Sequence, residues 1–195
     1  MNNEFELLRQ EISGCTKCVL CKGRINVVFG EGPANAKIMC IGEGPGRDED
    51  IQGRPFVGRS GQLLDKILCV CGFSRAKEVF IGNIVKCRPP ENRAPMPEER
   101  KACMPYLLKQ IELIDPKILI LLGATALNGL IDPSLKITKV RGTWIEWNGR
   151  LAMPTFHPAA LLRNPNLKKD AWEDFKKVVA KYRELVDPDH KSEHC

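Results

Sequence analysis

The sequence has no apolar run long enough to span a membrane, and its first residues lack the basic start and apolar core of a signal peptide. We therefore expect a cytoplasmic protein that does not associate with membranes. Charge of one sign does not dominate either, since the formal net charge is +6 over 195 residues. This mild basic excess is compatible with a polyanionic partner but does not identify one. Histidine is scarce, and His157 is the only one outside the C-terminal tail.

Cysteine, in contrast, is abundant, with nine residues. Without a secretory signal and with an odd count, a disulfide framework is disfavoured and metal or cluster binding is favoured. Cys15, Cys18 and Cys21 form a CxxCxxC run, in which thiolates three positions apart can reach one metal from a tight turn. Cys87 follows in a basic loop and Cys103 in the next helix. Four of these sulfurs could hold zinc or a [4Fe–4S] cluster; spacing alone does not separate the two, and Cys21 competes as a ligand.

Strand patterns alternate with helical patterns along the chain. Helices are predicted over residues 4–13, 61–71, 97–113 and 168–186, with a short one ending near residue 130. Strands are predicted over 37–41, 79–81 and 117–122, followed by a hairpin of 144–147 and 150–153 around an Asn-Gly turn. The alternation predicts one α/β domain with a mainly parallel sheet, spanning residues 1–186. We expect residues 187–195 to form a polar, disordered tail.

Ligands of such sheets bind beyond the carboxyl ends of the strands. The segments that follow the predicted strands are 42–56, 82–93, 123–125 and 157–165, and we expect them to converge on one rim. Glu43 lies there within a glycine-rich loop, and His157 follows the last strand. A dinucleotide site in this loop is disfavoured, because Pro45 and the acidic run Asp48-Glu49-Asp50 come next and would repel phosphate.

Four motifs make the chain recognisable when they are taken together. They are Gly42-Glu43-Gly44-Pro45-Gly46 with Glu49-Asp50, then Gly53-Arg54-Pro55-Phe56-Val57-Gly58, then Asn83 before Lys86-Cys87-Arg88-Pro89-Pro90, and finally His157-Pro158-Ala159-Ala160-Leu161-Leu162-Arg163-Asn164-Pro165. In this order they resemble the family 4 uracil-DNA glycosylases, and the likeness covers nearly the whole chain. The resemblance implies a three-layer α/β/α sandwich, a [4Fe–4S] cluster, and removal of uracil from DNA in base excision repair.

The resemblance also implies roles for individual residues. Phe56 would stack on uracil, Asn83 would read its polar edge, and Gly42 would leave clearance for the flipped base. Glu43 would position or activate the attacking water, and His157 would stabilise the departing base. The implied cluster ligands are Cys15, Cys18, Cys87 and Cys103. Phosphate contacts would come from Arg88, Arg93 and Arg163, and the wedge that fills the gap in the DNA would be Leu161 or Leu162.

Uracil-containing DNA, single- or double-stranded, is thus the expected partner, and we expect a monomer. Family 5 relatives lack a carboxylate at the position of Glu43, so the presence of Glu43 argues against that family. The uracil-DNA glycosylase variant that traps DNA covalently has a histidine after the second strand. No histidine occurs here between residues 83 and 103, so this variant is also disfavoured. Two other classes stay open. A non-catalytic iron–sulfur or zinc module that binds nucleic acid leaves Glu43, Phe56 and His157 without a task, and a nucleotide-binding redox enzyme needs a phosphate site.

Overall fold

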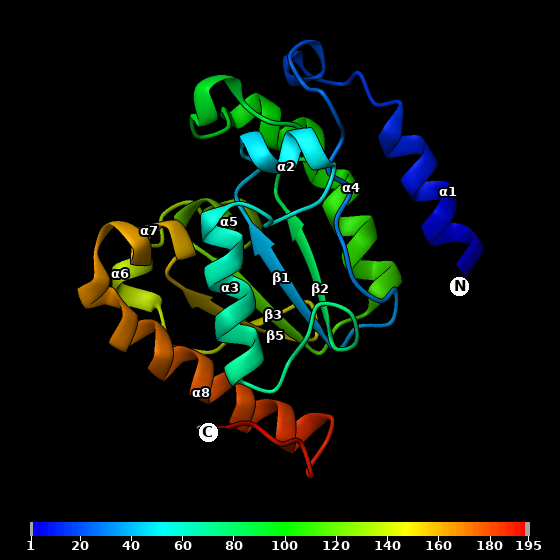
Figure 1. Ribbon diagram of the computed structural model, residues 1–195. Helices are drawn as coiled ribbons and strands as arrows, with labels where there is room; N and C mark the ends of the chain where they lie inside the picture. Colours follow the sequence, from blue (N-terminus) through cyan, green and yellow to red (C-terminus); the bar gives the residue numbers. More distant parts are fainter. Residues whose placement is uncertain (1, 194–195) are drawn as a thin grey trace.

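Three short apolar segments form the centre of the structure, a computed structural model that describes residues 2–193. β1 (Ile38–Gly42), β2 (Val79–Asn83) and β3 (Ile118–Leu122) are buried at every position, as expected for strands covered on both faces. β4 (Ile145–Trp147) and β5 (Arg150–Thr155) complete a five-stranded sheet in the order β2-β1-β3-β5-β4. β1, β2, β3 and β5 run parallel to one another (Figure 1), and β4 pairs antiparallel with β5. The predicted, mainly parallel sheet is confirmed.

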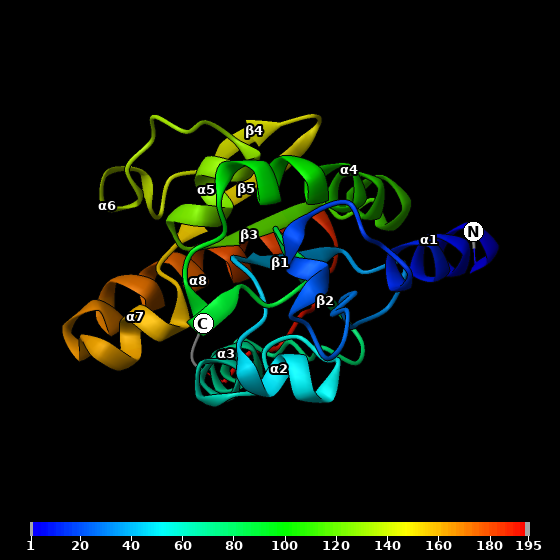
Figure 2. The same ribbon diagram turned by 90° about the horizontal axis from the view of Figure 1, so that it is seen from above.

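Helices cover both faces of this sheet, which confirms the three-layer fold (Figure 2). One face packs against α1 (Asn2–Ser13), α4 (Pro97–Ile114) and α5 (Ala124–Leu130). The other face packs against α3 (Arg59–Val70) and α8 (Lys168–Leu185). Three shorter helices that we did not predict lie in the connections: α2 (Arg47–Gln52), α6 (Ile137–Val140) and α7 (Pro158–Arg163). No helix within residues 2–193 is long and apolar enough to cross a membrane.

Local chemistry explains where the predicted elements begin and end. Pro97 occupies the first turn of α4, where its missing N–H has no cost, and the Glu99 carboxylate accepts a hydrogen bond from the Met96 N–H at 2.7 Å. At the hairpin between β4 and β5, Asn148 and Gly149 both have positive φ, as a tight two-residue turn requires. These boundaries lie close to the predicted ones.

The C-terminal tail differs from the prediction, because residues 187–193 fold back onto the domain. His190 stacks on Phe73 with ring centroids 4.4 Å apart, and its Nε2 lies 2.8 Å from the main-chain oxygen of Cys71. Tyr182 of α8 meets the same imidazole ring at 5.0 Å. The expectation of a disordered tail is therefore wrong for these residues, since one ring in a polar segment finds two aromatic partners. Residues 194 and 195 lie outside the described residues.

Candidate active site

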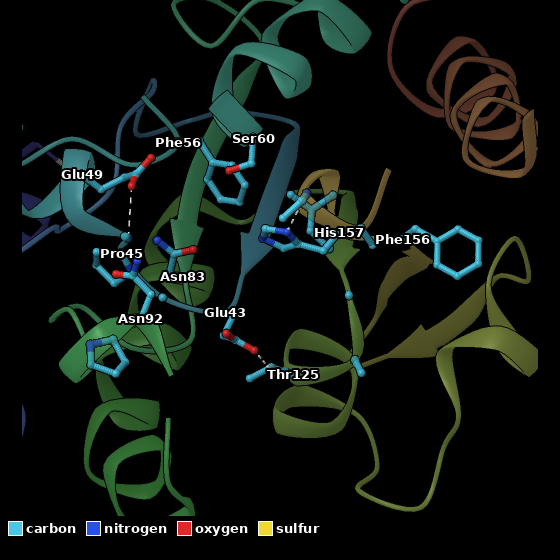
Figure 3. Close-up of a pocket in the computed structure, with 18 of the residues that line it drawn as sticks. Glu43, Pro45, Glu49, Phe56, Ser60, Asn83, Asn92, Thr125, Phe156 and His157 are labelled. Atoms are coloured by element: carbon cyan, nitrogen blue, oxygen red, sulfur yellow. Dashed lines mark hydrogen bonds between the residues drawn. The ribbon is translucent and has the colours of Figure 1, made fainter. Parts of the chain in front are cut away.

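The segments that follow β1, β2, β3 and β5 surround one cleft of about 540 Å³. Its lining includes Glu43 after β1, Asn83 at the end of β2, Thr125 after β3 and His157 after β5. Phe56 reaches the cleft from the connection between α2 and α3. Figure 3 shows these five side chains around a common space. The predicted convergence on one rim is therefore confirmed, and parallel α/β topology explains it.

Asn83 forms the floor of the cleft. Only 1% of its surface is exposed, and its Oδ1 has no hydrogen-bond partner among the described residues. The parallel register places Gly42 beside Asn83, and a Cβ at position 42 would lie 2.5 Å from Asn83 Oδ1 and 2.6 Å from Phe56 Cζ. Glycine is thus required where the amide meets the ring. A buried, unpaired amide oxygen is costly, so this position suits a ligand that brings a donor.

His157 presents a neutral imidazole to the cleft. It precedes α7, and its Nδ1 accepts a hydrogen bond from the Ala159 N–H at 3.1 Å, which leaves the ring proton on Nε2. Burial, helped by the charge of Arg163, lowers the pKa of His157 to about 4. The Phe56 and His157 ring centroids lie 5.6 Å apart with a tilt of 33°. The remaining N–H of His157 can therefore donate to a ligand without the ring carrying a charge.

Glu43 is held by a residue that the sequence analysis missed. Its Oε2 accepts a hydrogen bond from the Thr125 hydroxyl, in the first turn of α5 (Figure 3). Gly123, at the start of this turn, has a φ of +90°, and a Cβ there would lie 2.9 Å from the His157 Cβ. One junction between β3 and α5 therefore packs against His157 and orients Glu43. The signal that could have found Thr125 was its place just after the clearest predicted strand.

Two residues of the acidic run after the glycine loop, Glu49 and Asp50, are buried, whereas Asp48 is exposed. Glu49 accepts hydrogen bonds from the N–H groups of Val57 at 2.9 Å and Gly58 at 2.8 Å. Asp50 accepts one from the Ile25 N–H at 2.9 Å. Both carboxylates are at most 8% exposed. They hold neighbouring loops in place, and the segment braced by Glu49 is the one that presents Phe56.

A second cavity is lined by five cysteines from the N-terminal segment, the loop after β2 and α4: Cys15, Cys18, Cys21, Cys87 and Cys103. Arg24 Nη1 donates to Cys87 Sγ at 3.2 Å and to the Cys15 oxygen at 2.7 Å. Burial raises the pKa of the Cys87 thiol to about 11 and also raises that of Cys103. Forming thiolates here therefore requires positive charge in the cavity beyond that of Arg24.

The donor set of this cavity fits an iron–sulfur centre. Within residues 2–193, no three His, Cys, Asp or Glu side chains are grouped so as to hold one metal ion. The thiols surround the cavity, and in a [4Fe–4S] cluster each of four thiolates binds a different iron. The Arg24 N–H that already contacts Cys87 suits a sulfur ligand carrying negative charge. Cys21 lines the same cavity as the four implied ligands, so it remains a competitor.

The two leucines implied as wedges differ sharply in exposure. Leu161 is 1% exposed and packs against Phe156 and Ala171, whereas Leu162 is 39% exposed. Leu161 does not fit the wedge role, because inserting it into DNA would break this apolar cluster. The Phe156 ring of this cluster points away from the other side chains labelled in Figure 3.

The three arginines implied as phosphate contacts also differ. Arg93 pairs with the Glu99 carboxylate through two hydrogen bonds of 2.6 and 2.9 Å. Arg88 Nε donates to Asn92 Oδ1 at 2.7 Å, and Arg163 is exposed at the end of α7. The charge of Arg93 is thus partly neutralised within the loop, whereas no carboxylate pairs with Arg88 or Arg163 in the described chain.

Comparison with known proteins identifies the class that this fold and cleft define. The family model described as the uracil DNA glycosylase superfamily matches residues 29–176, which include the whole lining of the cleft. The chain therefore belongs to the uracil-DNA glycosylase superfamily.

Individual relatives narrow the assignment. The type-4 uracil-DNA glycosylase of Thermotoga maritima is 49% identical over 178 residues, covering 89% of this chain and 92% of the relative. That of Saccharolobus solfataricus is 48% identical over 185 residues, covering 90% and 85%. A type-5 uracil-DNA glycosylase of Pyrobaculum aerophilum is 29% identical over 146 residues, covering 67% and 64%. Within the superfamily, the chain belongs to the type-4 family.

Proposed function

We propose that this protein excises uracil from DNA by hydrolysing the N-glycosidic bond, which releases free uracil and leaves an abasic site for repair. The observation that carries the proposal is the unpaired Oδ1 of Asn83, buried beside Phe56 under Gly42. The N3–H of uracil supplies the hydrogen-bond donor that this oxygen lacks. The names of the type-4 relatives give the same activity for those proteins.

The pocket geometry supports uracil over cytosine. The Asn83 amide accepts from N3–H with Oδ1 and donates to O4 with its NH₂ group. Cytosine has an acceptor at N3 and a donor at C4, so it would leave two buried groups unpaired. The Phe56 ring supplies a stacking surface, worth about 1–3 kcal/mol for a base. Selection therefore comes from an amide held rigidly at the end of β2.

The bond cleavage needs both charges that develop to be stabilised. His157 Nε2–H donates to uracil O2 and stabilises the negative charge on the departing base. Because its pKa is about 4, His157 does this as a neutral donor and transfers no proton at pH 7. Glu43, oriented by the Thr125 hydroxyl, faces the sugar, stabilises its positive charge and accepts the proton of the attacking water.

The DNA must be deformed for the base to enter the cleft. A base within a duplex is reached by flipping it, and Leu162 is the exposed apolar side chain near His157 that can fill the gap. Arg88 and Arg163 supply phosphate contacts, and Arg93 mainly braces its loop through Glu99. We further propose a cytoplasmic monomer, since one chain supplies the whole cleft.

The cofactor in this proposal is a [4Fe–4S] cluster bound by Cys15, Cys18, Cys87 and Cys103. When bound, it ties the N-terminal segment, the loop after β2 and α4 together, and glycosidic hydrolysis requires no electron transfer from it. Four thiols around one cavity support this part of the proposal. Zinc is the alternative metal centre, and the colour of the purified protein distinguishes it from the cluster. A brown protein supports the cluster, while a colourless protein containing zinc supports the alternative.

The deciding experiment measures uracil release. Protein purified anaerobically with its metal centre intact is incubated with single- and double-stranded oligonucleotides that contain one uracil. Free uracil and a strand break after alkaline treatment are expected, and matched oligonucleotides with cytosine or thymine should stay intact. Binding without release would contradict the enzyme and support the non-catalytic nucleic-acid module.

A further inference from the structure

Lys86 lies between the two sites. It belongs to the short segment that runs from Asn83, at the end of β2, to Cys87, in the cysteine cavity. Its side chain is only 1% exposed, which is rare for a lysine unless its charge is paired. Neither the uracil chemistry nor the ligand set described above uses this ammonium group.

The contacts of Lys86 extend in both directions. Its Nζ donates a hydrogen bond to the main-chain oxygen of Asn83 at 2.8 Å. On its other side, the residue lines the cysteine cavity together with Cys87 and Cys103. The Val28 N–H donates to the Lys86 oxygen at 2.8 Å, which fixes the segment against the N-terminal part of the chain. A movement in the cavity is therefore connected directly to the end of β2.

The charge of Lys86 lacks a conventional partner. No carboxylate pairs with it in the part of the chain that the structure describes; the titratable side chain that acts on it is the thiol of Cys103. A buried cation without a counter-charge is strongly disfavoured. Thiolates bound to a metal centre carry the negative charge that is needed, and Arg24 supplies a second cation at Cys87.

We propose that Lys86 is the counter-ion of the thiolate centre and that its hydrogen bond to Asn83 couples the presence of that centre to the orientation of the uracil-reading amide. The inference rests on the proposed cluster. Lys86 is a positioning residue, since it touches no substrate. With the centre bound, attraction to the thiolates holds the ammonium inside the protein, where it donates to the Asn83 oxygen. Without the centre, the ammonium loses its counter-charge and the contact with Asn83 weakens.

The first test measures how firmly the cluster is held. Lys86→Met, Lys86→Arg and wild-type protein are purified anaerobically with the cluster, and the visible absorbance is followed in excess EDTA. Residues that support metal ligands typically change metal retention about tenfold to a hundredfold, so K86M should lose its absorbance faster by that factor. K86R keeps the charge and should lie closer to wild type. Lys101→Met is the control, because Lys101 is exposed and lies two residues before Cys103.

The second test measures the coupling to uracil recognition. K86M should lower kcat for uracil release about three- to tenfold, the range for one hydrogen bond, with KM for DNA unchanged. Equal absorbance half-lives of K86M and wild type would overturn the counter-ion role, and equal kcat values would overturn the coupling. If K86M does not fold, Lys86→Gln makes the same comparison with a polar, uncharged side chain. Should wild-type protein release no uracil, the proposed function fails, while the absorbance comparison still decides the role of Lys86.

Discussion

The uracil cleft and the cysteine cavity are built in different ways. The cleft lies where parallel strands end, so the sheet itself places the side chains, and the register of β1 and β2 sets Gly42 beside Asn83. The cavity is enclosed by segments that are far apart in the sequence, from Cys15 to Cys103, and four of its five cysteines lie outside strands and long helices. The hydrogen-bonded sheet holds the unpaired Asn83 amide in place without a ligand. We expect the irregular segments around the cavity, in contrast, to depend on a bound group for their relative positions.

This difference separates the expected effects of substitutions. Changes in the cleft should lower the rate of uracil release and leave the fold intact, because the strands stay paired. Changes in the cavity should first lower the retention of the metal centre and affect the rate through it. A cleft variant that mainly unfolds the protein would break the distinction.

The largest effect is expected for His157→Ala, which removes the proposed donor to uracil O2. Loss of one such donor typically costs about a hundredfold to a thousandfold in kcat. DNA binding, measured by fluorescence anisotropy, should change little. His190→Ala is the matched control, because His190 packs against Phe73 and does not line the cleft. Its loss should lower the melting temperature and leave kcat unchanged when the rate is measured below that temperature. An unaltered rate for H157A would remove His157 from the mechanism.

Asn83→Asp should follow, with uracil release reduced about tenfold to a hundredfold, because the carboxylate loses the donor to O4 and places a charge on a buried floor. Discrimination against cytosine should fall at the same time, since a carboxylate oxygen can accept a hydrogen bond from the amino group at C4 of cytosine. The measurement compares release from matched uracil and cytosine oligonucleotides. Asn148→Asp, in the hairpin turn, is the control and should change neither rate. Unchanged discrimination in N83D would place Asn83 outside the pocket.

Much of the cleft could be predicted from the sequence because strand ends are predictable. The apolar run of β3 and the glycines after β1 mark strands, and parallel topology then brings Glu43, Asn83 and His157 to one rim. The roles of these residues came from the resemblance to a family, since a lone Asn after a strand is ordinarily a turn residue.

The remaining features depend on contacts between distant segments. Burial of Glu49 depends on the Val57 and Gly58 N–H groups that turn back toward it, which no local pattern in the acidic run indicates. Which of two adjacent leucines is exposed depends on how α7 packs against α3 and against Ala171 of α8.

Thr125→Val tests whether the sheet alone places Glu43. The valine keeps the shape of threonine and loses the hydroxyl that donates to Glu43 Oε2. We expect kcat to fall about tenfold with KM unchanged, as for one hydrogen bond to a charged group. Thr125→Ser should recover most of the rate.

A double-mutant cycle decides whether Thr125 acts through Glu43. In a Glu43→Gln background, adding T125V should cost little further, because the carboxylate that Thr125 orients is already gone. Independent, multiplicative losses would show that Thr125 acts by another route.

The adjacent leucines offer a smaller but internally controlled comparison. Leu162→Ala should lower release from double-stranded DNA several-fold and leave release from single-stranded DNA nearly unchanged, because only a duplex leaves a gap to fill. Leu161→Ala should instead lower the free energy of unfolding by about 2–5 kcal/mol through the cavity it creates beside Phe156. Chemical denaturation and the two release assays separate these outcomes. Equal effects of L162A on both substrates would exclude the wedge.

The smallest effect is expected from pH. Burial lowers the pKa of His157 to about 4; the charge of Arg163 also lowers this pKa, and that of Glu49 raises it. The imidazole therefore stays neutral from about pH 8 to about pH 5.5, and kcat should show no histidine step in this range. The unfolded chain binds a proton at this histidine with a pKa near 6.5. The stability contributed by neutral His157 is therefore complete above about pH 6.5 and is lost as the pH falls towards 4. A pH–rate profile and melting curves of wild type and H157A check both statements, and an inflection of kcat near pH 6.5 that H157A abolishes would contradict the neutral donor.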